Sequence, residues 1–165
     1  MIVLGIDPGI AITGVVILNE EKGKQTLLHS EGITTTQKLS LAQRLLKLYE
    51  QLTFLIKTHK PDVAVLENLF FNTNAKTALI VGQARGVVQL ALAQNKLEIV
   101  EYTPLQVKMA LTGYGRADKN QIQQMVKQIL KLPKILTPDD VADAAAIALT
   151  HCFSYKLRMH ANAQT

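Results

Sequence analysis

Two short apolar runs that each end in an acidic residue constrain the fold more than any other feature of this sequence. The run from Ile2 to Ile6 is rich in β-forming residues and stops at Asp7. The run from Val63 to Leu66 is continuously apolar, as expected of a central strand that is buried on both faces, and it stops at Glu67. We therefore expect a sheet in which both runs are strands and both acids stand at strand ends.

The rest of the chain alternates further strands with amphipathic helices. Leucines at positions 41, 45, 48, 52 and 55 recur at three- and four-residue steps, which is typical of an amphipathic helix over residues 39–57. Further strands are expected over residues 14–18, 27–33 and 98–102, and further helices over 77–94, 104–111, 119–132 and 138–156. This order predicts the α/β class, with a mixed five-stranded sheet and helices on both of its faces.

Length and charge indicate one domain with a polyanionic partner. The chain has 165 residues, of which 48% are hydrophobic, so a single compact domain can bury a real core. We expect that domain over residues 1–157 and a C-terminal tail over 158–165. The net charge of +5 fits a partner such as nucleic acid, although many soluble proteins are mildly basic.

Cysteine usage and the N-terminus bear on location. The single cysteine, Cys152, excludes an internal disulfide and a thiolate zinc site, so a reducing compartment, the cytoplasm, is expected. The apolar start is interrupted by Asp7 before a signal-peptide core forms, and no stretch is long enough to cross a bilayer. Neither targeting nor membrane association is expected.

The first two acids are predicted to meet at one edge of the sheet. If the helix over residues 39–57 is a right-handed crossover, the strands that end at Asp7 and Glu67 are parallel neighbours. Ligands of open α/β sheets bind beyond the carboxyl ends of the strands. Two carboxylates placed there repel each other unless a positive charge lies between them.

The last helix supplies further acids. Thr137 is expected as its N-cap and Pro138 as its first helical residue. Asp140 in the first turn can serve either as a ligand or as a partner of free backbone amides, as can Asp139, which is expected to face solvent or cap. Asp143 lies on an apolar helix face, where an unpaired carboxylate is unfavourable and a cation would relieve it.

Oxygen donors favour a hard metal ion. Four acids without a nearby cysteine or paired histidines favour Mg²⁺, for which Mn²⁺ can substitute, over zinc. Two such ions can activate a water and stabilise the leaving oxygen in an in-line displacement at phosphorus.

Several blocks in a fixed order carry a resemblance to the RuvC family over almost the whole chain. These blocks are Gly5-Ile6-Asp7-Pro8-Gly9 with Thr13-Gly14, Glu67-Asn68-Leu69-Phe70, Gly82-Gln83-Ala84-Arg85-Gly86, and Asp140-Val141-Ala142-Asp143-Ala144 closing on Thr150-His151-Cys152. The resemblance implies a ribonuclease H-like fold, a homodimer, Mg²⁺ dependence and symmetric nicking of a four-way DNA (Holliday) junction in recombination and repair. It also suggests a RuvA and RuvB branch-migration complex as partner.

Site residues carry over from that resemblance position by position. The acids correspond to Asp7, Glu67, Asp140 and Asp143. Some members have a histidine at the position of Asp140, so its role as ligand or as base is left open.

Three further positions match DNA contacts of the family. Phe70 resembles an aromatic wedge that stacks on an unpaired base, worth about 1–3 kcal/mol per base, although burial under the next helix is its alternative. Lys108 and Lys119 match lysines that line the active cleft, where a cation can bind the scissile phosphate, although a lone lysine is usually a solvated charge. Arg85, in mid-helix, is a weaker candidate with packing as its alternative.

The helix over residues 77–94 is predicted to need cover on more than one side. It carries few charges, and Gly82 and Gly86 allow close approach of another backbone. Burial within the monomer explains this, and so does a two-fold interface, which suits a substrate that needs two symmetric cuts.

Three other functions are weighed against junction cleavage. The turn with Gly5, Asp7 and Gly9 resembles the phosphate loop of actin-like ATPases, but those proteins repeat the domain and need a second phosphate loop. A resolvase-like nuclease of ribosomal RNA maturation is disfavoured by Phe70 and the long terminal helix. A junction-binding module without cleavage is disfavoured because four acids hinder phosphate binding.

Overall fold

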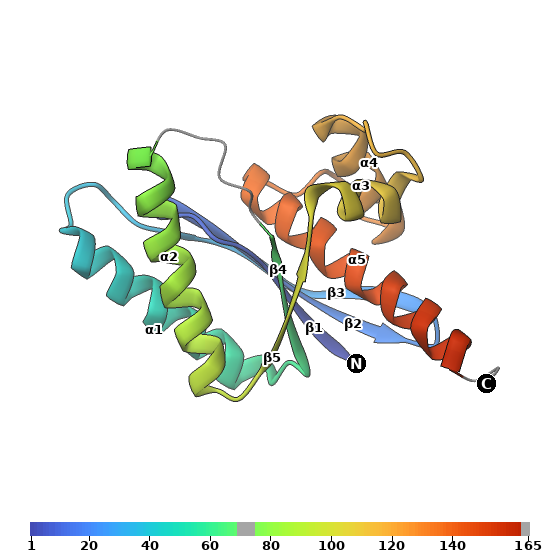
Figure 1. Cartoon of the computed structure of the whole chain (residues 1–165), viewed down its shortest axis with the longest axis horizontal. Coiled ribbons are helices and arrows are strands. Elements are labelled where there is room, and N and C mark those ends of the chain that lie inside the picture. The colour runs from blue at the N-terminus through green and yellow to red at the C-terminus, as the bar shows by residue number, and fades with distance from the viewer. Residues whose placement is uncertain (69–74, 163–165) are drawn as a thin grey trace.

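The computed structural model describes residues 1–68 and 75–162, with side chains described over 1–68 and 78–155. Figure 1 shows the element order along the chain. The strands are β1 (Ile2–Asp7), β2 (Ile12–Glu21), β3 (Lys24–Thr34), β4 (Val63–Glu67) and β5 (Glu98–Tyr102). The helices are α1 (Leu41–His59), α2 (Ala75–Gln94), α3 (Pro104–Thr112), α4 (Lys119–Ile129) and α5 (Asp139–Asn162).

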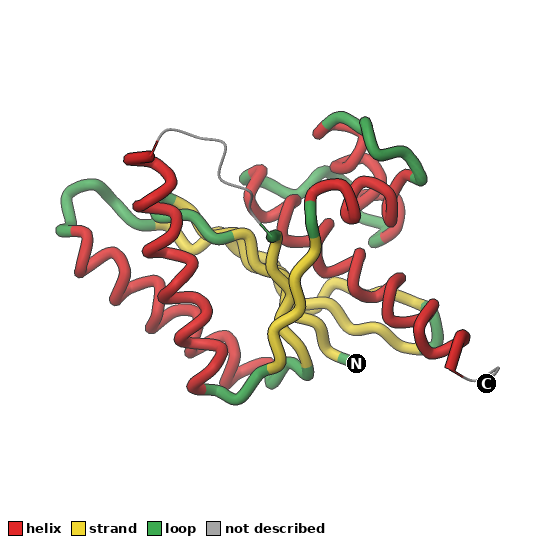
Figure 2. The backbone as a smooth tube through the Cα atoms, in the orientation of Figure 1, coloured by secondary structure: helices red, strands yellow, loops and turns green. Residues whose placement is uncertain are grey.

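The strands form one mixed five-stranded sheet, as predicted, and their order is β3-β2-β1-β4-β5 (Figure 2). β1 pairs antiparallel with β2 and parallel with β4, so the α1 crossover makes the strands that carry Asp7 and Glu67 direct neighbours. The β1–β4 register ends at Ile6 opposite Leu66. Asp7 and Glu67 therefore lie just beyond the last residues that pair between β1 and β4, at the carboxyl ends of these two parallel strands.

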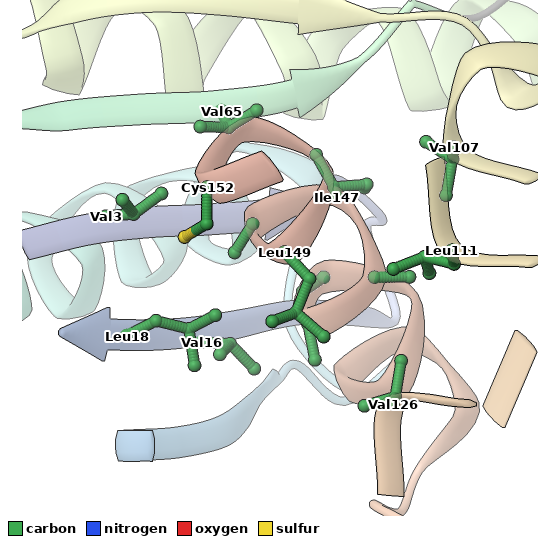
Figure 3. Close-up of a cluster of buried hydrophobic side chains, with 14 of the residues drawn as sticks. Val3, Val16, Leu18, Val65, Val107, Leu111, Val126, Ile147, Leu149 and Cys152 are labelled. Atoms are coloured by element: carbon green, nitrogen blue, oxygen red, sulfur yellow. The ribbon is translucent and has the colours of Figure 1, made fainter. Parts of the chain in front are cut away.

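Helices cover both faces of the sheet (Figure 1). One core contains Leu4, Ile6 and Leu66 and packs against α1 and α2. The other contains Val3 and Val65 and packs against α3, α4 and α5, as Figure 3 shows. Because side chains alternate along a strand, the odd-numbered positions of β1 and β4 face α5. The same alternation places the side chains of Asp7 and Glu67 on the α5 side.

Glycines let α5 lie directly on the sheet. A Cβ added to Gly14 on β2 would come 1.9 Å from the carbonyl oxygen of Asp140, and one added to Gly5 would come 2.2 Å from that of Ala144. Both distances are far below van der Waals contact, so side chains at these positions would push the helix away. The two glycines thus bring the first turns of α5 close to the end of β1.

Element boundaries differ from the sequence-based expectation by a few residues. α1 begins at Leu41, two residues later than expected, because Ser40 forms a capping box with Gln43. α5 begins at Asp139, one residue after the expected start at Pro138, and continues to Asn162, beyond the expected end at Lys156. Within the described residues, no helix is both long and apolar enough to span a membrane.

Candidate active site

Asp7 ends β1 and is followed by a tight turn. The Thr13 hydroxyl donates to the carbonyl oxygen of Gly9 at 2.6 Å, and the Gly9 amide donates back to that hydroxyl at 3.3 Å. A Cβ at Gly9 would meet the carbonyl of Ile12 at 2.2 Å, so the turn requires glycine. These contacts fix the backbone that carries Asp7.

The environment of Asp7 opposes its negative charge. Burial, followed by the nearby charges of Asp143, Glu67 and Asp140, raises the pKa of the Asp7 carboxyl from 3.8 to about 7, although Lys119 acts in the opposite direction. A carboxyl whose pKa is shifted by burial together with neighbouring charges is typical of functional sites. All four predicted acids therefore lie near enough to interact.

Glu67 ends β4, and its backbone is contacted by Arg85 from α2, which packs on the face of the sheet away from α5. Burial and the charge of Asp143 raise the pKa of the Glu67 carboxyl, while Arg85 and Lys119 act to lower it. The Arg85 guanidinium donates to the backbone carbonyl of Glu67 at 2.6 Å. Its other terminal nitrogen lies 2.5 Å from a carboxylate oxygen of Glu101.

Lys119 occupies the position of a counter-ion for the acids of α5. Its ammonium nitrogen lies 3.1 Å from Asp143 and 3.2 Å from Asp139. Lys119 is the first residue of α4, after the capping residue Asp118. A cation is unfavourable at a helix N-terminus, so its location there is explained by the acids it faces and not by the helix.

Two of the acids and both lysines line one cavity. It measures about 200 Å³, with Glu67, Asp143, Lys108 and Lys119 among its polar lining and Val107 among its apolar lining. Lys108 is half-buried on α3, which begins at a capping box formed by Thr103. The cavity thus joins negative carboxylates to two cations, which is a suitable arrangement for a phosphodiester and a divalent metal ion.

The donor set fits a hard divalent cation. Carboxylate oxygens are the ligands that Mg²⁺ prefers, and the mutual repulsion of these acids is relieved by a positive charge. Among the side chains that the structure describes, however, no three acidic, histidine or cysteine groups stand close enough to share one ion. A metal ion held by Asp143 would compete with Lys119 for that carboxylate.

Comparisons with known proteins agree with this geometry. The family model described as crossover junction endodeoxyribonuclease RuvC matches residues 3–151. The RuvC of Alkaliphilus oremlandii is 54% identical over 151 residues, which cover 92% of both chains. The RuvC of Ruminiclostridium cellulolyticum is 52% identical over 157 residues, which cover 95% of both. The chain belongs to the RuvC family.

Solved structures support the same assignment. Thermus thermophilus RuvC in complex with a Holliday junction substrate is 34% identical, covers 96% of each chain and gives a TM-score of 0.91. T. thermophilus RuvC in a second structure is 35% identical with a TM-score of 0.88 over 96% of this chain and 97% of the other. The resemblance to the RuvC family and the ribonuclease H-like fold are thereby confirmed.

The structure brings most of the predicted site residues together. Asp7, Glu67, Asp140 and Asp143 interact electrostatically, and both lysines line the same cavity. Phe70 lies outside the described residues.

Asp143 is less buried than its apolar helix face predicts, because its side chain is 35% exposed. The positive charge expected beside it is present: the ammonium of Lys119 lies 3.1 Å from the carboxylate. Apolar side chains do lie near it, since Ala146 and Ile147 line the same cavity.

Two contacts were not predicted. Asp139 was expected to face solvent or cap; it is exposed, but it pairs with Lys119 and accepts a hydrogen bond from Gln123 at 3.1 Å. Arg85 was a weak candidate, and its contacts with Glu67 and Glu101 join residues that are far apart in sequence. No local sequence motif predicts either contact. The local signal for Arg85 is its position between Gly82 and Gly86 in one of the matching blocks.

Proposed function

We propose that this chain is a structure-specific DNA endonuclease that resolves Holliday junctions by metal-dependent phosphodiester hydrolysis. The observation that carries the proposal is that acids from β1, β4 and α5 lie close enough to shift one another's pKa, next to a cavity lined by Glu67, Asp143 and two lysines, in a chain of the RuvC family. The net charge of +5 suits a DNA substrate. The cellular role that follows is homologous recombination and DNA repair.

The metal is proposed to be Mg²⁺, with Mn²⁺ as a substitute, at two ions per site. Asp7, Glu67, Asp143 and Asp140 would hold them, with Asp140 acting as a ligand or as a base. When bound, the ions supply an activated water and stabilise the leaving oxygen at phosphorus. Lys108 and Lys119 bind the scissile phosphate, and Phe70 stacks on an unpaired base at the junction centre.

The same proposal includes a homodimer formed through α2. Leu79 and Leu90 on α2 are 66% and 52% exposed. A Cβ added to Gly82 or Gly86 would meet nothing within 4 Å. These positions recur at helical spacing, so α2 presents an apolar face with room for a second backbone. A two-fold axis there would give two active sites for two symmetric cuts.

Partner and location stay predictions. A RuvA and RuvB branch-migration complex follows from the family resemblance, and the cytoplasm follows from the single cysteine, Cys152, which is buried in the structure. The single nuclease domain over residues 1–157 with a tail over 158–165 also stays a prediction.

The test is substrate selectivity of the wild-type protein. A mobile four-way DNA junction, its matched linear duplex and an RNA duplex are incubated with Mg²⁺ or with EDTA. Paired symmetric nicks in the junction alone, and only with Mg²⁺, are expected. Cleavage of RNA in preference to the junction would favour the RNA nuclease. Junction binding without cutting under Mg²⁺ or Mn²⁺ would reduce the chain to a binding module.

A further inference from the structure

The end of β4 is secured on one side only. The paired register between β1 and β4 stops at Leu66, so Glu67 has no partner on β1. On the other side Glu67 lies opposite Tyr102 of β5, and the Asn68 amide donates to the Tyr102 carbonyl at 2.8 Å. The backbone carbonyl of Glu67 itself accepts from the Arg85 side chain at 2.6 Å.

Arg85 reaches this carbonyl from the face of the sheet opposite to the active cavity. It lies on α2, which packs with α1 on the far face, whereas the Glu67 side chain lines the cavity on the α5 face. The Arg85 side chain is only 13% exposed, and its second nitrogen is held 2.5 Å from Glu101 on β5. The guanidinium therefore bridges α2, β4 and β5 without entering the cavity.

We propose that Arg85 is a positioning residue, which fixes the end of β4 so that the Glu67 carboxylate is presented to the metal and to the scissile phosphate. The proposal rests on the function proposed above, in which Glu67 is a metal ligand. Partners that orient a metal ligand commonly change metal affinity or activity by about 10- to 100-fold when they are removed. Arg85 does this through the backbone of Glu67, not through its carboxylate.

An arginine is required for geometric reasons. The planar guanidinium donates two hydrogen bonds in fixed directions, here to a carbonyl on one strand and a carboxylate on the next. A lysine at position 85 retains the charge but cannot hold both acceptors with the same rigidity. Glutamine removes the charge and the fork together. Glu101→Gln keeps an acceptor for Arg85 while removing the ion pair, which provides a second, milder variant.

The experiment measures binding and cleavage separately in Arg85→Lys, Arg85→Gln and Glu101→Gln. Mn²⁺ affinity is measured by titration calorimetry without DNA, junction affinity by gel shift in EDTA, and single-turnover cleavage as a function of Mg²⁺. Unchanged junction affinity is expected. Mn²⁺ affinity is expected to fall about 10- to 100-fold in Arg85→Gln, with smaller losses in the other two variants, and excess Mg²⁺ should restore part of the cleavage rate.

Contrary outcomes separate the alternatives. Weaker junction binding with a shallower salt dependence would make Arg85 a DNA contact and overturn the proposal. Wild-type Mn²⁺ affinity and Mg²⁺ dependence in all three variants, with or without a lower melting temperature, would also overturn it. The exposed Lys57→Gln on α1 is the control for loss of one positive charge. A wild-type protein that binds Mn²⁺ but never cuts the junction refutes the proposed function, whereas the calorimetric result still decides the role of Arg85.

Discussion

The ammonium of Lys119 lies 3.1 Å from the carboxylate of Asp143, so a side chain of the protein stands where a metal ion would have to compete for that acid. The same ammonium lies 3.2 Å from Asp139 and thereby joins the beginnings of α4 and α5. The negative charge of these acids is thus partly balanced by Lys119 before any metal ion binds. Each side chain of the pairing can be removed by a single substitution.

Lys119→Met is expected to lower the melting temperature of the metal-free protein, and more so at pH 8 than at pH 5. Burial raises the pKa of Asp7, Glu67 and Asp143, and the charge of Lys119 acts against that rise, so the repulsion among the ionised acids is less well offset when Lys119 is removed. Because Lys119 is 52% exposed, the loss should stay within about 1 kcal/mol. Thermal unfolding with EDTA and with Mg²⁺ measures this. An equal loss at both pH values, or one that Mg²⁺ does not reduce, would contradict it.

Asp7→Asn is expected to stabilise the metal-free protein above pH 7. The folded chain raises the pKa of Asp7 from 3.8 to about 7, so folding favours the protonated carboxyl. Stability from this group is therefore full below pH 4 and is lost as the pH rises towards 7. Asparagine removes that loss, and each kcal/mol regained raises the melting temperature of a chain this size by about 2–4 °C.

Melting curves from pH 4 to 8 in EDTA test this sign. The gap between Asp7→Asn and wild type should widen with pH and narrow when Mg²⁺ is added to the wild type. A gap that is constant with pH would show that repulsion among the acids does not govern the stability of the site.

Gly14→Ala is expected to displace α5 and destabilise the protein. The new Cβ would lie 1.9 Å from the Asp140 carbonyl, which is backbone and cannot turn aside. Overpacking of this kind typically destabilises by about 1–3 kcal/mol. Gly32→Ala is the matched control, because Gly32 is the cross-strand partner of Gly14 and its Cβ would come no nearer than 3.2 Å, to side-chain atoms. Equal melting temperatures for the two variants would contradict the close packing of α5.

If the proposed homodimer forms through α2, Leu90→Glu is expected to yield a monomer. Leu90 lies on the apolar face of α2 with Leu79 and the two glycines, and a buried unpaired carboxylate there is unfavourable. Sedimentation velocity measures the mass, and junction cleavage should lose its symmetric pairing of nicks. Leu46→Glu, at an equally exposed leucine on α1, should leave the mass unchanged. Sedimentation of the wild type as a monomer would contradict the proposed interface on α2.

The strands and the meeting of the acids were predictable because they rest on local patterns. Apolar runs that end at Asp7 and Glu67, with one helix between them, imply parallel neighbours whose acids share an edge. These features depend on periodicity and handedness, which sequence carries directly.

Contacts between distant elements were not predictable. The bridge from Arg85 to Glu67 depends on where α2 lies across the sheet, and the pairing of Lys119 with Asp139 depends on how α4 docks on α5. Similarly, His29 and His59 are far apart in sequence, yet their rings lie 5.1 Å apart where β3 meets α1. Such contacts follow from the packing of whole elements, which a local pattern does not encode.

The catalytic role of the acids is tested by measuring junction cleavage and junction binding on the same samples of wild type and Asp7→Asn. We expect Asp7→Asn to bind the four-way junction as tightly as wild type and to make no nicks with Mg²⁺ or Mn²⁺, whereas wild type makes paired nicks with Mg²⁺ and none in EDTA. Cleavage by Asp7→Asn at the wild-type rate would contradict the claim that these acids form the catalytic site.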